Sequence, residues 1–171
     1  MKVPDATRKA IEAAIAAGTA RVVNGPAADA GDGRRAKPER VAEGFRYDGN
    51  AVEFTVPVET VSEANQRGWR GKASRAGSQR KAVAAVLGKH LRELADFADH
   101  YHAGWPLGVT ITRLGGRRLD ALSNLGAALK AIEDTVALVI GADDGDPRWR
   151  GRAEQEPGGE VGVRIRLSQE V

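Results

Sequence analysis

The sequence predicts a small α+β domain, and three observations support this fold class. Some segments alternate apolar with polar residues, as strands do, and others repeat apolar residues every three or four positions, as helices do. These segments do not alternate regularly along the chain. The chain has 171 residues, of which 42% are hydrophobic, so it is long enough to bury one core. We expect a mixed sheet of about four strands with two main helices on one face.

The N-terminal part, residues 1–44, is predicted to be an appendage to this domain. Residues 5–17 are rich in alanine and indicate a short helix that ends at Gly18. Residues 24–44 combine glycine, proline, alanine and charged residues, a composition typical of a linker. The domain itself is therefore predicted to cover residues 45–171.

A strand and a long helix are predicted to open the domain. Apolar residues alternate over residues 52–58, which indicates a half-buried strand. Pro57 cannot donate a backbone hydrogen bond, so this strand is expected at an edge of the sheet. A helix is expected from about Gly71 to Tyr101. Its apolar stripe comprises Val83, Val86, Leu87, Leu91, Leu94, Phe97 and Tyr101.

The second half of the domain predicts a strand, a helix and two further strands. Residues 107–112 alternate as a strand, and residues 122–140 have the apolar spacing of a helix. Residues 148–155 are expected to form an amphipathic strand, and residues 157–159, Pro-Gly-Gly, a tight connection. The cleanest alternation in the chain, residues 161–167, predicts the last strand.

The composition excludes several classes of protein. The chain has no cysteine, so disulfides, thiolate metal sites and cysteine nucleophiles are excluded. The N-terminus is too polar and too evenly charged for a signal peptide, and no apolar stretch is long enough to span a membrane. These features predict a cytoplasmic protein without a membrane partner.

Positive charges are concentrated in one segment, although the formal net charge is only +3. Residues 67–81 contain six arginines and lysines and no acid, and residues 113–118 add a second basic cluster. Such clusters bind nucleic-acid phosphates, although a solvated helix face is the alternative. Trp69 could stack on a base or ribose. The predicted DNA-binding residues are Arg67, Trp69, Arg70, Lys72, Arg75, Arg80, Lys81, Arg117 and Arg118.

Carboxylates flank the predicted second helix. Asp120 comes just before this helix, and Asp143, Asp144 and Asp146 come just after it. Acids this close repel one another unless a cation or a basic partner neutralises them. Together the two acidic sites could hold Mg²⁺, or Mn²⁺ in its place, provided that the chain folds back along a helix nearly 30 Å long.

Simpler roles for these acids remain open. Asp120 is also a suitable N-cap for the helix. The acidic residues 143–146 could form an ordinary turn, with Arg148 or Arg150 as the counterion.

The segment LDALSNLGAALKAIEDTVALVIGADDGDPRW, residues 119–149, resembles the signature of RusA-type Holliday junction resolvases, especially phage and prophage members. That signature has a short acidic-Asn motif at the start of a helix and a later Asp-Asp pair. The upstream segment VSEANQRGWRGKASRAGSQRKAVAAVL, residues 61–87, resembles the part of these proteins that precedes and opens the first long helix. The resemblance covers roughly residues 50–168.

The resemblance implies a symmetric homodimer that binds four-way DNA junctions and nicks them with Mg²⁺ in recombination and repair. Asp120, Asp143 and Asp144 would act in catalysis and hold the metal, with Asp146 as an auxiliary ligand. Lys130 would reach the phosphate, and the basic residues 67–81 would track the DNA backbone.

Ser123 departs from the family pattern, because family members carry Asp immediately before the motif Asn. A neutral hydroxyl is a weak Mg²⁺ ligand. One alternative is therefore a junction-binding protein of the same fold with impaired catalysis. Another is a protein-interaction module that uses no nucleic acid.

Overall fold

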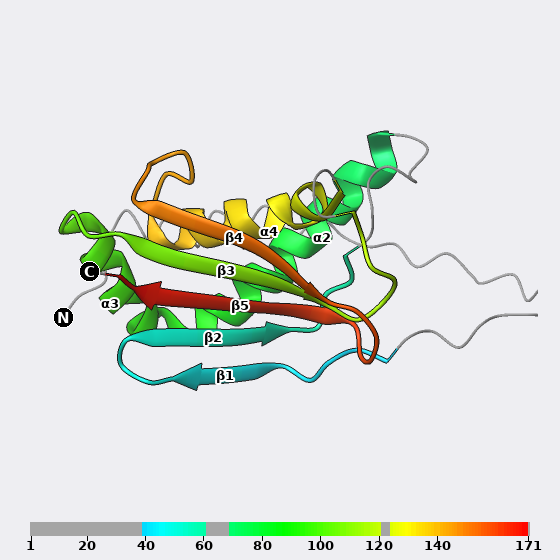
Figure 1. Cartoon of the computed structure of the whole chain (residues 1–171), viewed down its shortest axis with the longest axis horizontal. Helices are drawn as coiled ribbons and strands as arrows, with labels where there is room; N and C mark the ends of the chain where they lie inside the picture. The colour runs from blue at the N-terminus through cyan, green and yellow to red at the C-terminus, as the bar shows by residue number, and fades with distance from the viewer. Residues whose placement is uncertain (1–38, 61–68, 121–123, 171) are drawn as a thin grey trace, which may run out of the picture.

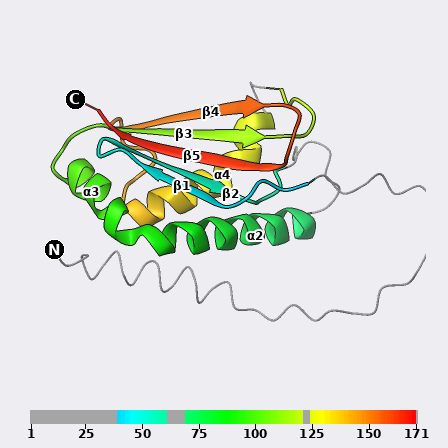
Figure 2. The same cartoon turned by 90° about the horizontal axis from the view of Figure 1, so that it is seen from below.

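A five-stranded mixed sheet with helices packed on one of its faces forms the domain (Figure 1, Figure 2). This computed structural model describes residues 39–60, 69–120 and 124–170, and the side chains of residues 69–72 fall outside that description. The predicted α+β class with a small mixed sheet is confirmed, and the described residues form five strands where about four were expected. The helix predicted at residues 5–17 lies outside the described residues.

The chain's last strand lies in the middle of the sheet. The strand order is β1-β2-β5-β3-β4, and neighbouring strands are antiparallel except β3 and β4, which are parallel. The strands are β1 (Gly44–Tyr47), β2 (Ala51–Val56), β3 (Leu107–Leu114), β4 (Trp149–Glu156) and β5 (Gly162–Gln169). The parallel pair requires a crossover between its strands, and helix α4 (Asn124–Ile140) forms this crossover.

The predicted long helix is divided into two helices. The segments are α2 (Trp69–Leu87), a 3₁₀ turn η2 (Gly88–His90) and α3 (Leu91–His102). The division occurs at Gly88, a residue with low helix propensity, and His90 departs from helical dihedrals. The His90 ring stacks on Phe45 with centroids 3.8 Å apart. The apolar stripe itself was predicted correctly, because every member is buried or packs against the core.

One hydrophobic core lies between the sheet and the helices. It contains the inward residues of the central strands and the apolar faces of the helices. Fully buried examples are Val52 and Phe54 of β2, Ile165 and Leu167 of β5, and Ile132 of α4. The sheet alternation read from the sequence therefore gives the correct inward face.

One topological prediction was wrong. The strand of residues 51–56 is not an edge strand, because β1 pairs with one of its sides and β5 with the other. Pro57 lies just beyond that strand and so removes no hydrogen bond from the ladder. The short connection predicted at residues 157–159 is present, and it joins strands that are not neighbours, since β3 lies between β4 and β5.

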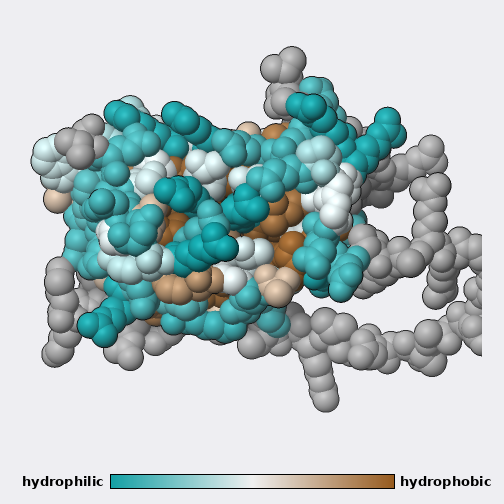
Figure 3. Space-filling model, turned by 60° about the horizontal axis from the view of Figure 1, so that its bottom comes forward, coloured by the Kyte–Doolittle hydropathy of each residue, from teal (hydrophilic) through white to brown (hydrophobic). Residues whose placement is uncertain are grey.

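The opposite face of the sheet is not covered by described residues (Figure 2). Figure 3 shows the side of the molecule near β1, where polar side chains cover most of the surface and leave smaller apolar areas between them. In the described part of the chain, no helix combines the length and the apolar composition that crossing a membrane requires.

Candidate functional site

The acidic residues predicted to share a metal lie before and after α4 in the chain. The carbonyl oxygen of Asp120 accepts hydrogen bonds from the backbone of Asn124 and Leu125, at 3.2 and 3.0 Å, so Asp120 leads into the first turn. The acidic turn follows the last turn of the same helix, which spans about 25 Å. Asp120 and the acidic turn therefore belong to segments at the two ends of α4. No group of three acidic or histidine residues spaced for a metal occurs among the described residues.

Asp144 is neutralised by a lysine from α4. Lys130 donates to Asp144 Oδ2, and its Nζ also lies 3.2 Å from Asp134 Oδ1 and 3.7 Å from Glu133 Oε2. The hydrogen bond to Asp144 raises the pKa of Lys130, and the same bond lowers the pKa of Asp144. The lysine predicted to reach a phosphate is therefore engaged with acids of its own chain.

Asp146 is neutralised by the arginine two residues later. Arg148 NH2 lies 2.6 Å from Asp146 Oδ2, and Arg148 Nε donates to Oδ1 at 3.1 Å. These bonds hold the pKa of the Asp146 carboxyl well below its usual range. The same guanidinium stacks over the ring of Tyr101 at 4.6 Å and donates to its carbonyl oxygen at 3.2 Å.

The remaining acid of the turn, Asp143, bonds to the backbone of the turn itself. Asp143 Oδ1 accepts a hydrogen bond from the backbone of Gly145 at 2.9 Å, as aspartates in turns commonly do. The turn thus matches the simpler interpretation of its sequence, in which basic side chains and backbone groups satisfy the carboxylates. Arg148 is the counterion, whereas Arg150 pairs with Glu170 at 2.6 Å.

The basic residues predicted to bind DNA from α2 differ in their burial and in their partners. Arg67 and the side chains of Trp69, Arg70 and Lys72 lie outside the described part of the chain. Arg75 is half-buried and lines a groove of about 400 Å³ between α2 and residues 57–59. Arg80 pairs with Asp134 at 3.2 Å, and Lys81 is exposed.

Arg113, from the second basic cluster, serves the fold. Its side chain is buried and donates to the carbonyl oxygens of Thr60 at 3.4 Å and of Gly115 and Arg117 at 3.0 Å each. Burial lowers the pKa of this arginine. Of the same cluster, Arg117 and Arg118 are exposed.

A row of arginines on the open face of the sheet was missed by the sequence reasoning. The register places side chains from five strands in one line, in the order Arg46, Glu53, Arg166, Thr110, Arg152. All three arginines are exposed, and their positions are two strands apart, or about 10 Å. The sequence does hold a signal for this row, because arginines alternate with the inward residues in both 150–152 and 164–166.

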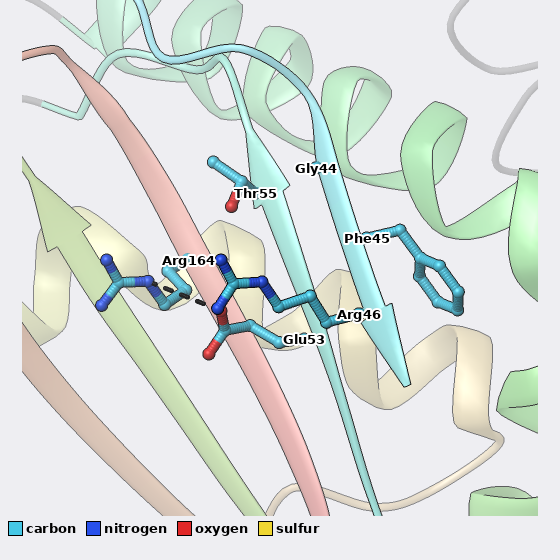
Figure 4. Close-up of a pocket in the computed structure, with 6 residues that line it drawn as sticks. All are labelled: Gly44, Phe45, Arg46, Glu53, Thr55 and Arg164. Carbon is cyan, nitrogen blue, oxygen red and sulfur yellow. Dashed lines mark ion pairs between the residues drawn. The ribbon is translucent and has the colours of Figure 1, made fainter. Parts of the chain in front are cut away.

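A shallow hollow of about 480 Å³ lies at one end of this row (Figure 4). Arg46 extends toward Glu53, whereas the guanidinium end of Arg164 points away from it and only Arg164 Nε faces Glu53, at 3.9 Å from Oε1. Arg164 NH1 also pairs with Glu156 at 2.7 Å. Phe45 points away from the hollow, so the hollow is lined by charged and hydroxyl groups.

No protein-family model matches the sequence, and no curated protein matches it. The function is therefore inferred from the residues and their geometry.

Proposed function

We propose that the protein binds DNA through the open face of its sheet, with four-way junctions as the DNA structure that the RusA resemblance implies. The row of exposed arginines, Arg46, Arg166 and Arg152, is the observation on which this proposal rests. Guanidinium groups donate two parallel hydrogen bonds to phosphate, and they keep their charge at any physiological pH.

These three arginines differ from their neighbours on the same face. Arg150 and Arg164 are paired with Glu170 and Glu156, whereas the described carboxylates form no ion pair with Arg46, Arg152 or Arg166. A rigid sheet holds the unpaired guanidiniums at fixed spacing, which suits a polyanion better than a small ligand. Glu53 offsets part of this charge, although Arg164 in turn partly neutralises Glu53.

The chemistry of this face favours contacts to the DNA backbone. Its described outward positions are mostly arginine, glutamate, threonine, serine and glycine, with Ala51 and Leu114 as apolar members and without an aromatic ring for base stacking. Phosphate contacts give affinity that depends little on sequence and falls steeply with salt. We therefore expect recognition of DNA shape rather than of base sequence.

The direct test is a fluorescence-anisotropy titration of a synthetic four-way junction at several salt concentrations. Arg166→Glu should weaken binding at least tenfold and reduce the slope of log affinity against log salt by about 1. Arg92→Glu is the matched control, because Arg92 is exposed on α3, on the helix side of the sheet. Equal losses in both variants, or no affinity of the native chain even at low salt, would reject the proposal.

Metal-dependent cutting of the junction is the second candidate function. One observation favours it: Asp120 is exposed before α4, on the same loop as the exposed Arg117 and Arg118. We expect binding without nicking in Mg²⁺ or Mn²⁺, because Asp144 and Asp146 of the turn are already paired with Lys130 and Arg148. Nicking that disappears in EDTA and in Asp120→Asn, with junction binding retained, would select the nuclease instead. If only the Ser123→Asp variant cuts, the missing carboxylate explains the inactivity.

A further inference from the structure

Strand β4 forms one edge of the sheet, and no other described strand pairs with its free side. It is eight residues long, and Arg150, Gly151, Arg152, Ala153 and Glu154 are all exposed. A long, exposed edge without proline is a template for pairing with another strand. The question is which strand fits it.

The hydrogen bonds to β3 show which backbone groups face outward. The carbonyl oxygen of Arg148 accepts from Leu107 of β3, and that of Glu156 accepts from Gly115, directly after β3, at 2.9 Å each. The even-numbered residues of β4 therefore bond to β3. In a parallel pair, alternate residues bond to the same neighbour. The odd-numbered residues Gly151, Ala153 and Gln155 therefore direct their N–H and C=O groups to the free side.

The charges along this strand are arranged symmetrically with opposite sign. Residues 150–156 read Arg-Gly-Arg-Ala-Glu-Gln-Glu. Arg152 and Arg150 lie one and three residues before the central Ala153. Glu154 and Glu156 lie one and three residues after it. An identical strand running in the opposite direction would thus meet every arginine with a glutamate.

We propose that β4 pairs with β4 of a second copy of this chain, antiparallel, about a two-fold axis at Ala153. Ala153 then lies opposite Ala153 of the second copy as a hydrogen-bonded pair, and Gly151 lies opposite Gln155. The non-hydrogen-bonded positions, where side chains approach most closely, hold Arg152 with Glu154 and Arg150 with Glu156. The result is one continuous sheet across two subunits, closed by an interface in which each copy uses the same surface.

The backbone and the charges together select this register. The outward groups require odd-numbered residues to face odd-numbered residues, so the register can change only in steps of two. One step in either direction places Arg152 opposite Arg152 or Glu154 opposite Glu154 of the second copy, and like charges repel. The small side chains at positions 151 and 153 leave room where the two copies meet.

Arg152 and Glu154, the charged residues on either side of Ala153, have few partners among the described residues of their own chain. No ion pair or hydrogen bond to Arg152 is formed by the described residues, and Glu154 accepts only a long hydrogen bond, of 3.5 Å, from Thr112. Pairing would engage Arg152, so Arg46 and Arg166 of each copy would remain for DNA. The two-fold axis lies perpendicular to the sheet, and both copies would present these arginines on the same side.

A single introduced cysteine tests the register, because the natural chain has none. In Ala153→Cys the two thiols would belong to residues whose Cα atoms are about 5.5 Å apart, within reach of a disulfide. Mild oxidation of the full chain without DNA should give a covalent dimer. Arg92→Cys, exposed on α3, is the control for random collisions. Equal cross-linking of the two variants would overturn the proposal.

Charge reversal tests the pairing by sedimentation velocity, again without DNA. Arg152→Glu and Glu154→Arg should each raise the dissociation constant of the dimer at least tenfold, because each places like charges opposite one another. The double variant should restore the native dimer, since the charges again oppose. Mixing the two single variants should also restore it, now as a mixed dimer. If neither combination recovers the dimer, this interface is wrong, and circular dichroism of each variant excludes unfolding as the cause.

Discussion

Lys130 in α4 binds the carboxylate of Asp144, which lies in the loop that follows the same helix. The loop therefore folds back along the helix instead of extending from its end. Lys130 also lies within 4 Å of Glu133 and Asp134, so one ammonium group serves three carboxylates. This arrangement holds the acidic turn in place by ion pairing.

The first prediction concerns this pair. Lys130→Met and Asp144→Asn should each lower the free energy of unfolding by up to about 1 kcal/mol, because exposed ion pairs contribute little individually. The double variant should lose no more than the larger single loss, because both changes remove one interaction. Urea unfolding of the four proteins measures this coupling. Strictly additive losses would show that the two side chains act independently.

The second prediction concerns acid stability. Hydrogen bonds from Arg148 lower the pKa of Asp146 below its ordinary value, so the folded state favours the ionised carboxylate. The resulting stabilisation is present above about pH 4 and is lost as the pH falls through the lower, folded-state pKa. Asp146→Asn should therefore be less stable than the native chain at pH 6, and the difference should shrink below pH 4. Urea midpoints across this range provide the measurement.

Arg148→Gln is the companion variant for this test. It removes the groups that depress the pKa, so its stability should fall less steeply with acid than that of the native chain. A native-like acid profile in Arg148→Gln would contradict the assignment of the shift to this pair.

The third prediction concerns the buried arginine. Arg113→Met should lower the free energy of unfolding by about 3 kcal/mol, because three carbonyl oxygens lose their charged donor in a buried place. Arg113→Lys keeps one charged donor group and should lose less. Urea unfolding compares the two. Equal, small losses would mean that water satisfies these carbonyl groups.

The fourth prediction compares two glycines with positive φ. Gly115 (φ 72°) lies against the backbone of Glu160, whereas Gly158 (φ 90°) has open space where a Cβ would be. Gly158→Ala should cost about 1 kcal/mol, for the left-handed backbone alone. Gly115→Ala should cost several times more, because its methyl group would push apart the ends of β3 and β5. Thermal and urea unfolding should rank the variants in this order.

The local patterns were sufficient to predict most of the fold. The period-two alternation of residues 161–167 and the apolar stripe of α2 and α3 gave the buried faces correctly, because burial imposes these periods directly. The pairing of strands was not predictable in the same way. Nothing in the composition of residues 51–56 distinguishes a central strand from an edge strand, since that depends on β1 and on a strand more than 100 residues later.

The site was less predictable than the fold. The sequence shows where the acidic residues lie, but the partners of the acidic turn depend on the course of the chain after α4. Lys130 was expected to face a phosphate, and only the folded-back loop brings Asp144 to it. The arginine row required the register of five strands, which no local pattern contains.

The position of β5 between β2 and β3 determines when the sheet can be completed. Until residues 162–169 are available, the earlier strands can form only two separate pairs, β1 with β2 and β3 with β4. During synthesis, β2 and β3 therefore each keep one unpaired edge until the fifth strand leaves the ribosome. A chaperone that shields such edges would be most useful in that interval, and a truncation before Gly162 would leave two half-sheets with no strand to join them.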